Sequence, residues 1–207
     1  MTHFPICLNL AGKRCLVVGV GPEAERKAAA LQRAGAQVVA TPHFAPADLD
    51  GCALAMAADV TPAVGTVVSR AAQARGIPVN VADRPELCSF ITPAVIERAP
   101  VTLAISTGGA SPALARRLRE TLDAIVPRRL GALAALAGEF RLRVRRQIAD
   151  PARRRAFWDR LLDGPVARLA LAGEQDAARR RLEVALGAET AGAASREAAP
   201  EVAPEVA

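Results

Sequence analysis

The sequence has no tyrosine, and aromatic residues make up only 3% of it, so any hydrophobic core must be built from aliphatic side chains. Its two histidines, His3 and His43, lie far apart, and its four cysteines include no Cys-x-x-Cys pair. These absences argue against a pre-assembled zinc site, and we expect no metal site. Scattered cysteines of this kind are typical of reduced, mostly buried thiols, which indicates a cytoplasmic protein.

No apolar run approaches the roughly 18–20 residues that a membrane span needs, and no signal peptide is visible. We therefore expect no membrane partner. The net charge of +6 rests almost wholly on arginine, because Lys13 and Lys27 are the only lysines. Since stacking aromatics are scarce and no recognition motif accompanies the charge, we expect an acidic ligand rather than a nucleic acid.

Short apolar runs alternate with helical patterns through the first part of the chain, which predicts an α/β fold with an open, doubly wound parallel sheet. The expected strands are 14–20, 36–42, 52–58, 77–83 and 101–107, and the expected helices are 23–34, 64–75 and one that follows residue 107. Beyond Pro127 the pattern is helical only, with helices expected at 130–150, 151–164 and 172–187.

The first strand is followed by Gly-Val-Gly-Pro-Glu-Ala, which has the form G-x-G-x-x-A and opens a helix. Gly19 permits the tight turn, Gly21 lets a pyrophosphate approach the backbone, and the helix begins with free N–H groups. The motif favours a dinucleotide site over a merely structural turn. Gly19, Gly21, Pro22 and Glu23 are its predicted cofactor-binding residues.

The acidic residue that usually binds the adenosine ribose is missing from the end of the second strand. Thr41, His43 and Phe44 stand there instead, so the sequence leaves the choice between NAD and NADP open. We predict that these three residues, with Asp59 after the third strand, complete the cofactor site.

The fourth strand ends on a carboxylate, Asp83, which is followed by Pro85. Asp83 could cap the next turn, or it could stand at the strand's carboxyl end and face a ligand, since open α/β sheets bind ligands at that edge. A second glycine-rich loop, 106–112, ends in Ser111 and Pro112, which predicts a capped helix start.

Two segments, NVADRPELCSFITP (80–93) and STGGASPALARRLR (106–119), carry a resemblance to a known family. Together with AGKRCLVVGVGPEAERK they resemble the siroheme synthase family, specifically its precorrin-2 dehydrogenase/sirohydrochlorin ferrochelatase module. The resemblance runs from about Phe4 to Trp158. It implies NAD-dependent oxidation of precorrin-2 to sirohydrochlorin and, in many members, insertion of ferrous iron as a substrate to give siroheme.

The resemblance also assigns roles to residues. Asp83 occupies the position of the family's catalytic aspartate, which would accept a proton as hydride leaves and would assist pyrrole N–H deprotonation during chelation. The substrate carboxylates would be held by the second glycine-rich loop, through Ser106, Gly108, Gly109 and Ser111. Arginines in 141–146 and 153–155 could contribute, or could form solvated helix faces. The family further implies a homodimer and a separate uroporphyrinogen methyltransferase that supplies precorrin-2.

On this basis the expected domains are a Rossmann-like NAD-binding domain (1–100), a dimerisation and substrate-loop segment (101–126), a helical C-terminal domain (127–187) and a disordered tail (188–207). Only residues 43–51 join the second and third strands, where the family places a helix and a strand. Extended, they reach about 30 Å, enough to pass one neighbouring strand. We therefore expect a sheet shortened by one edge strand and helix.

Several positions beside the expected cofactor site depart from the family pattern. Val20 replaces the middle glycine of the first loop, Asp59-Val60-Thr61 replaces Thr-Asp-Asp, and Gly65 replaces a helix asparagine. With the shortened crossover, these departures predict reduced NAD affinity. They also leave open the alternative of a non-catalytic family member that only binds tetrapyrrole or NAD.

Overall fold

The computed structural model describes the backbone of residues 3–197 and the side chains of residues 3–191. The chain divides into two compact units. One unit holds the chain up to Ala94 together with Ser106–Ala115, and the other holds Val95–Ile105 and the chain from Arg116 onward. The four domains expected from the sequence stay a prediction.

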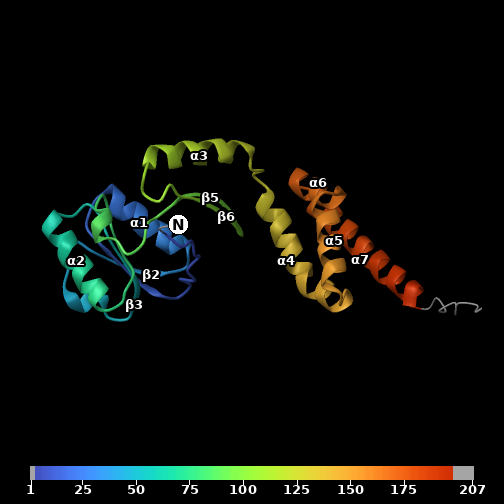
Figure 1. Ribbon diagram of the computed structural model, residues 1–207, viewed down its shortest axis with the longest axis horizontal. Coiled ribbons are helices and arrows are strands. Elements are labelled where there is room, and N and C mark those ends of the chain that lie inside the picture. The colour runs from blue at the N-terminus through green and yellow to red at the C-terminus, as the bar shows by residue number, and fades with distance from the viewer. Residues whose placement is uncertain (1–2, 198–207) are drawn as a thin grey trace, which may run out of the picture. The chain divides into compact units, whose positions relative to one another are not determined.

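The first unit is built on a four-stranded sheet in which all neighbouring strands run parallel, in the order β2-β1-β3-β4 (Figure 1). Its strands are β1 (Arg14–Val18), β2 (Gln37–Thr41), β3 (Cys52–Ala57) and β4 (Val79–Val81). Its helices are α1 (Pro22–Arg33) and α2 (Pro62–Ala74), with two short 3-10 helices, η1 (Pro46–Leu49) and η2 (Pro85–Leu87). The predicted Rossmann-like parallel sheet is confirmed.

Helices cover both faces of this sheet, because successive side chains of a strand point to opposite sides. Cys15 and Val17 of β1 pack in one core cluster with Leu31 of α1. Leu16 and Val18 pack in another, which also contains α2 side chains. Burial on both faces explains why β1 is a continuous apolar run rather than an alternating one.

The crossover from β2 to β3 is as short as the sequence indicates, and the sheet begins at β2 as its edge strand. η1 takes the place of a crossover helix: the Asp48 carboxylate accepts a hydrogen bond from the Ala45 N–H at 2.8 Å and starts the turn. Leu49 at its end is fully buried in the core cluster on the α2 face. One buried leucine thus covers sheet surface that a whole helix would otherwise cover.

The fifth strand expected at 101–107 does not join the parallel sheet. β6 (Val101–Ile105) pairs instead with β5 (Ala94–Arg98), which the sequence analysis missed, in a separate two-stranded sheet. Its residues alternate between half-buried and exposed, whereas β3 is buried almost throughout. An alternating strand has one wet face, so it does not suit the interior of a sheet covered on both sides.

The second unit is mainly helical. After α3 (Pro112–Ile125) come α4 (Leu130–Gln147), α5 (Pro151–Leu162), α6 (Pro165–Ala172) and α7 (Gln175–Glu197). Its core cluster begins with side chains of α4 spaced three or four residues apart, which is one face of a helix. These side chains, Leu133, Leu136, Phe140 and Val144, pack against residues of α5, α6 and α7.

Two helical details differ from the expectation. α6 is a separate helix, which begins at Pro165 directly after Gly164 and ends at Gly173 in the left-handed conformation (φ 98°). The tail expected to be disordered from residue 188 continues α7 as far as Glu197. Residues 188–197, the first ten of the expected tail, are rich in alanine and free of proline, and alanine is the best helix former. Residues 198–207 of the predicted tail lie outside the described residues.

The arginines of the second unit divide between structural and solvated roles. Arg154 donates hydrogen bonds to the carbonyls of Ile148 and Ala149 at the end of α4, at 2.8 and 2.5 Å. Arg153 pairs with Glu189 at 2.8 Å. Arginines 141, 143, 145 and 146 lie on the exposed side of α4. In the described part of the chain, no helix is both long and apolar enough to cross a membrane.

The start of α4 generates a stability prediction. A Cβ at Gly131 would lie 2.1 Å from the Ala99 carbonyl oxygen, whereas a Cβ at Gly138 of the same helix would meet open space. Gly131→Ala should lower the free energy of unfolding of the second unit by about 1–3 kcal/mol, because backbone must move. Gly138→Ala should raise it by about 0.5–1 kcal/mol through the helix preference of alanine. Thermal unfolding followed by circular dichroism measures both, and equal effects would refute this packing.

Candidate active site

The candidate site lies at the carboxyl-end edge of the parallel sheet, where open α/β sheets bind ligands. Three loops of the first unit meet this edge. The loop after β1 carries the glycine motif, the loop after β3 carries Asp59, and the loop after β4 carries Asp83.

Both glycines of the first loop are required by close approaches of protein atoms. Gly19 has φ 124°, and a Cβ there would lie 1.7 Å from the Ala58 carbonyl oxygen at the end of β3. Gly21 has φ 151°, and a Cβ there would lie 2.6 Å from Asp59 Oδ2. Pro22 follows as the first residue of α1. The approach of a pyrophosphate to Gly21 stays a prediction; in the structure Gly19 is approached by the Ala58 backbone carbonyl and Gly21 by the side chain of Asp59.

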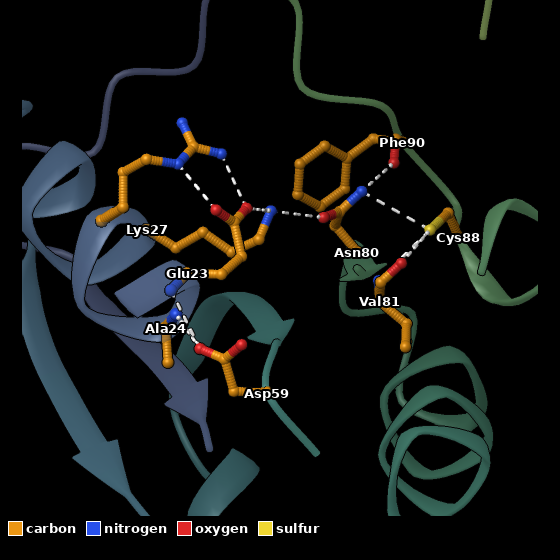
Figure 2. A network of polar contacts seen from close by, with 9 residues as sticks. Glu23, Ala24, Lys27, Asp59, Asn80, Val81, Cys88 and Phe90 are labelled. Atoms are coloured by element: carbon orange, nitrogen blue, oxygen red, sulfur yellow. Dashed lines mark hydrogen bonds and ion pairs between the residues drawn. The ribbon is translucent and has the colours of Figure 1, made fainter. Parts of the chain in front are cut away.

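That side chain is the carboxylate of Asp59, which caps α1 (Figure 2). Its Oδ2 accepts hydrogen bonds from the backbone N–H groups of Glu23 and Ala24, each at 2.9 Å. Asp59 itself has φ 54°, a left-handed conformation that aspartate tolerates better than most residues. The first amides of α1 are the ones that a dinucleotide phosphate uses in this motif. Asp59 therefore occupies the two amides that a dinucleotide phosphate would need, and the binding of a dinucleotide here stays a prediction.

The side chain of Glu23, a predicted cofactor-binding residue, is engaged in ion pairs on α1. Its carboxylate accepts hydrogen bonds from Arg26 at 2.7 and 2.6 Å and lies 3.4 Å from Lys27 Nζ. The hydrogen bond from Arg26 lowers the pKa of Glu23, and Lys27 acts in the same direction against the effect of burial.

Lys27 is buried, with 5% of its surface exposed, and it connects α1 to β4. Its Nζ donates to Asn80 Oδ1 at 3.0 Å, and Asn80 Nδ2 donates to the Phe90 carbonyl oxygen at 3.1 Å (Figure 2). This chain of hydrogen bonds spans the loop that carries Asp83. Sequence reasoning missed it, although an asparagine between Val79 and Val81 in a buried strand signals a polar partner.

The residues after β2 form a turn beside the first loop. The Thr41 carbonyl accepts a hydrogen bond from the Gly19 N–H at 2.9 Å, and the Thr41 hydroxyl donates to the His43 carbonyl at 2.6 Å. His43 is exposed, whereas Phe44 packs against the core cluster on the α2 face. Their role as cofactor contacts stays a prediction, and the packing of Phe44 gives it a structural role as well.

Asp83 lies in a turn that the Arg84 N–H closes on the Val81 carbonyl at 3.3 Å, and it has the left-handed φ of 57°. Arg84, and not Asp83, is the N-cap residue of the following η2. No side chain makes a capping hydrogen bond there, so Asp83 does not cap η2. Its carboxylate is exposed and has no hydrogen-bond partner among the described residues. Of the two roles that the sequence left open, capping the next turn is excluded.

The thiol of Cys88 fixes the base of this turn. It accepts a hydrogen bond from the Val81 N–H at 3.2 Å and lies 3.3 Å from the carbonyl oxygens of Val81 and Arg84. A thiol that bridges the backbone on both sides of Asp83 holds the turn closed. Three cysteines are at least partly buried, as expected, while Cys7 is exposed.

The second glycine-rich loop belongs to the same compact unit as the sheet. Ser111 Oγ accepts from the Leu114 N–H at 3.2 Å, which confirms the predicted cap of α3. Ser106 Oγ accepts from the Gly108 N–H at 3.0 Å. Gly108 and Gly109 have positive φ angles of 66° and 86°. Binding of substrate carboxylates here stays a prediction. Within the described residues no group of three or more His, Cys, Asp or Glu side chains could hold a metal ion.

The buried lysine generates a prediction. Lys27→Met should lower the free energy of unfolding by about 1–3 kcal/mol, because it leaves the buried Asn80 oxygen without its donor. Lys13→Met is the matched control, since Lys13 is exposed, and should change stability by less than about 0.5 kcal/mol. Urea unfolding measures both variants. Equal losses would show that Lys27 does not support the fold through Asn80.

The lowered pKa of Glu23 generates a second prediction. Because its pKa is lower in the folded state, its contribution to stability is present above its unfolded pKa of about 4.3 and is lost as the pH falls through the folded value. Glu23→Gln should therefore lower the melting temperature at pH 7, and its difference from the wild type should shrink below about pH 4. Thermal unfolding between pH 3 and pH 7 measures this difference, and a constant value would contradict it.

Comparison with protein-family models finds three matches that follow one another along the chain. A model described as putative NAD(P)-binding matches residues 6–94, one described as the central part of sirohaem biosynthesis proteins matches 98–125, and one described as the sirohaem synthase dimerisation region matches 129–186. The first coincides with the four-stranded sheet and its helices.

Similar whole proteins agree with these matches. A siroheme synthase of Thioalkalivibrio sulfidiphilus is 44% identical over 90% of this chain, and one of Methylococcus capsulatus is 43% identical over 97%. The chain spans about half the length of these relatives, 42% and 46%. A solved structure titled SirC, precorrin-2 dehydrogenase, shares the fold, with a TM-score of 0.67 and 23% identity over 87% of this chain and 99% of that one. These successive matches and relatives show that the chain is similar to one part of the siroheme synthases, along residues 6–186.

Proposed function

We propose that this chain oxidises precorrin-2 to sirohydrochlorin with NAD as the hydride acceptor. The observation that carries the proposal is the Asp83 carboxylate, which is exposed, takes no part in capping and stands at the carboxyl end of a parallel strand. The glycine motif lies at the same edge of the sheet. The similar curated proteins are siroheme synthases, and the similar solved structure is a precorrin-2 dehydrogenase.

The oxidation removes a hydride and a proton from the tetrapyrrole. NAD, when bound, would supply the hydride acceptor, and Gly19, Gly21 and the first amides of α1 would hold it. The proton would pass to Asp83, which acts as the general base. An exposed carboxylate without a protein partner is free to accept it. The turn tied by Cys88 and the Lys27–Asn80 contact would hold this carboxylate in place.

The substrate's acidic side chains would be bound by the loop that opens α3. The positive end of the helix dipole lies there, and Ser106, Gly108, Gly109 and Ser111 shape the loop. Ferrous iron would be a second substrate of the same site, with Asp83 accepting the pyrrole protons that the metal displaces. A separate uroporphyrinogen methyltransferase would supply precorrin-2, and the four free thiols fit a reducing cytoplasm.

Pairing of two copies is part of the proposal. Residues 129–186 match the sirohaem synthase dimerisation region. On α3, Leu114, Leu118 and Ile125 are exposed, at 51%, 41% and 70% of their surface. Large apolar side chains that recur on one side of a helix are typical of an interface, and a second copy would cover them.

An anaerobic absorbance time course with precorrin-2, with and without NAD, tests the proposed activity. We expect NAD-dependent formation of sirohydrochlorin by the wild type, and a loss of at least about 100-fold in turnover for Asp83→Asn. Asp50→Asn is the control, because Asp50 is an exposed aspartate that precedes β3 at the opposite end of the sheet. It should keep wild-type turnover.

Two outcomes would count against the proposal. Wild-type turnover in Asp83→Asn would remove Asp83 as the base. Tetrapyrrole binding by the wild type without any NAD-dependent oxidation would favour a non-catalytic binding protein. Addition of ferrous ion after the first step shows whether the same site also inserts the metal.

A further inference from the structure

We propose that Asp59 competes with the phosphates of the dinucleotide for the first amides of α1 and thereby sets the affinity of the site. The inference rests on the proposed function, because it concerns the same cofactor. It assigns Asp59 a role that differs from the cofactor contact expected from its position after β3: its carboxylate occupies the place of a ligand group.

The contact has the chemistry of an anion site that is already filled. One carboxylate oxygen accepts hydrogen bonds from two successive helix amides, those of Glu23 and Ala24, both at 2.9 Å. Charge-assisted hydrogen bonds of this kind, at the positive end of a helix, are what a bound phosphate would make. A phosphate oxygen and Asp59 Oδ2 cannot accept from the same two N–H groups at once.

Asp59 is exposed, but its carboxylate lies close against the glycine loop. A Cβ at Gly21 would lie 2.6 Å from Asp59 Oδ2, 2.7 Å from its Cγ and 2.9 Å from its Cβ. The space that the missing side chain of Gly21 creates is therefore taken by Asp59. The two residues are complementary, which distinguishes this contact from a chance approach of an exposed side chain.

The backbone on both sides of Asp59 is fixed by hydrogen bonds. The Ala58 N–H donates to the Val18 carbonyl at 3.0 Å, and Thr61 Oγ1 accepts from the Val64 N–H at 3.4 Å to cap α2. Release of the α1 amides is therefore a rotation of the Asp59 side chain rather than a movement of the loop. The contact is a reversible internal competitor.

The displaced carboxylate would also stay close to the phosphates and repel them. The cations near the start of α1 are already committed, since Arg26 pairs with Glu23 and Lys27 contacts Glu23 and Asn80. Asp59 therefore weakens dinucleotide binding twice, by occupying the amides and by its charge. A neutral residue at position 59 would remove both effects.

Calorimetric titration with NAD of the wild type, Asp59→Asn, Asp59→Ala and the control Asp50→Asn tests the proposal. Asp59→Ala should lower the Kd for NAD by about 3- to 30-fold, the range that corresponds to the loss of a helix cap. Asp59→Asn removes the charge and keeps an acceptor for the amides, so its Kd should fall between those of the wild type and Asp59→Ala. Asp50→Asn should bind NAD with the Kd of the wild type, because it removes a carboxylate at the other end of β3, away from the α1 amides.

The outcomes separate failure of the inference from failure of the proposed function. Equal Kd values for wild type and both Asp59 variants would overturn the inference and leave the cofactor site standing. Weaker binding by Asp59→Asn and Asp59→Ala would also overturn it, because Asp59 would then support the site. Absence of NAD binding in all four proteins would overturn both. If Asp59→Ala does not fold, Asp59→Asn decides alone, since it keeps the cap.

Discussion

The candidate site depends on the contact between the Asp59 carboxylate and the first two amides that α1 offers. It joins the end of β3 to the helix that follows β1, and the same segment after β3 accounts for both glycines of the first loop. Gly19 lets the loop pass the Ala58 carbonyl, and Gly21 leaves space for Asp59 itself. A motif normally associated with a cofactor phosphate thus has an internal anion as its partner. Under our proposal, ligand binding at this loop would be an exchange of one anion for another.

A second contact, made by the cation Lys27 rather than by an anion, joins α1 to β4. The buried Lys27 ammonium reaches Asn80 in β4, and Asn80 reaches the backbone at Phe90. The glycine loop and the turn of Asp83 are therefore connected through one helix, although they lie far apart in sequence. Buried polar groups of this kind are costly unless each has a partner, so they fix the relative position of the elements they join. The base that we propose for proton transfer stands on the turn that this network supports.

The parallel sheet could be predicted from the sequence because its signals are local: buried apolar runs, glycines at turns and helical spacing between them. The short crossover followed from counting residues 43–51, but η1 within it was not predicted. The fifth strand was predicted correctly as a strand, but its placement in the parallel sheet was wrong, because β6 was assigned by its apolar content and its alternating exposure suits a sheet with one wet face. The contacts of Asp59 and Lys27 join residues more than thirty positions apart, so their partners could not be identified from the sequence, although Asn80 in a buried strand signals that it has a polar partner. The cap of α3 by Ser111 could be predicted from the sequence, because donor and acceptor are three residues apart.

The departures from the family pattern beside the cofactor loop acquire a physical meaning from the fold. With Asp59 on the α1 amides, the reduced dinucleotide affinity that we predict would have a cause in one side chain rather than in the shortened sheet. The most direct measurement is a ¹⁵N–¹H correlation spectrum of the wild type during titration with NAD. The amide signals of Glu23 and Ala24 should move in step with saturation. Saturation by NAD that leaves these signals in place would contradict the shared site.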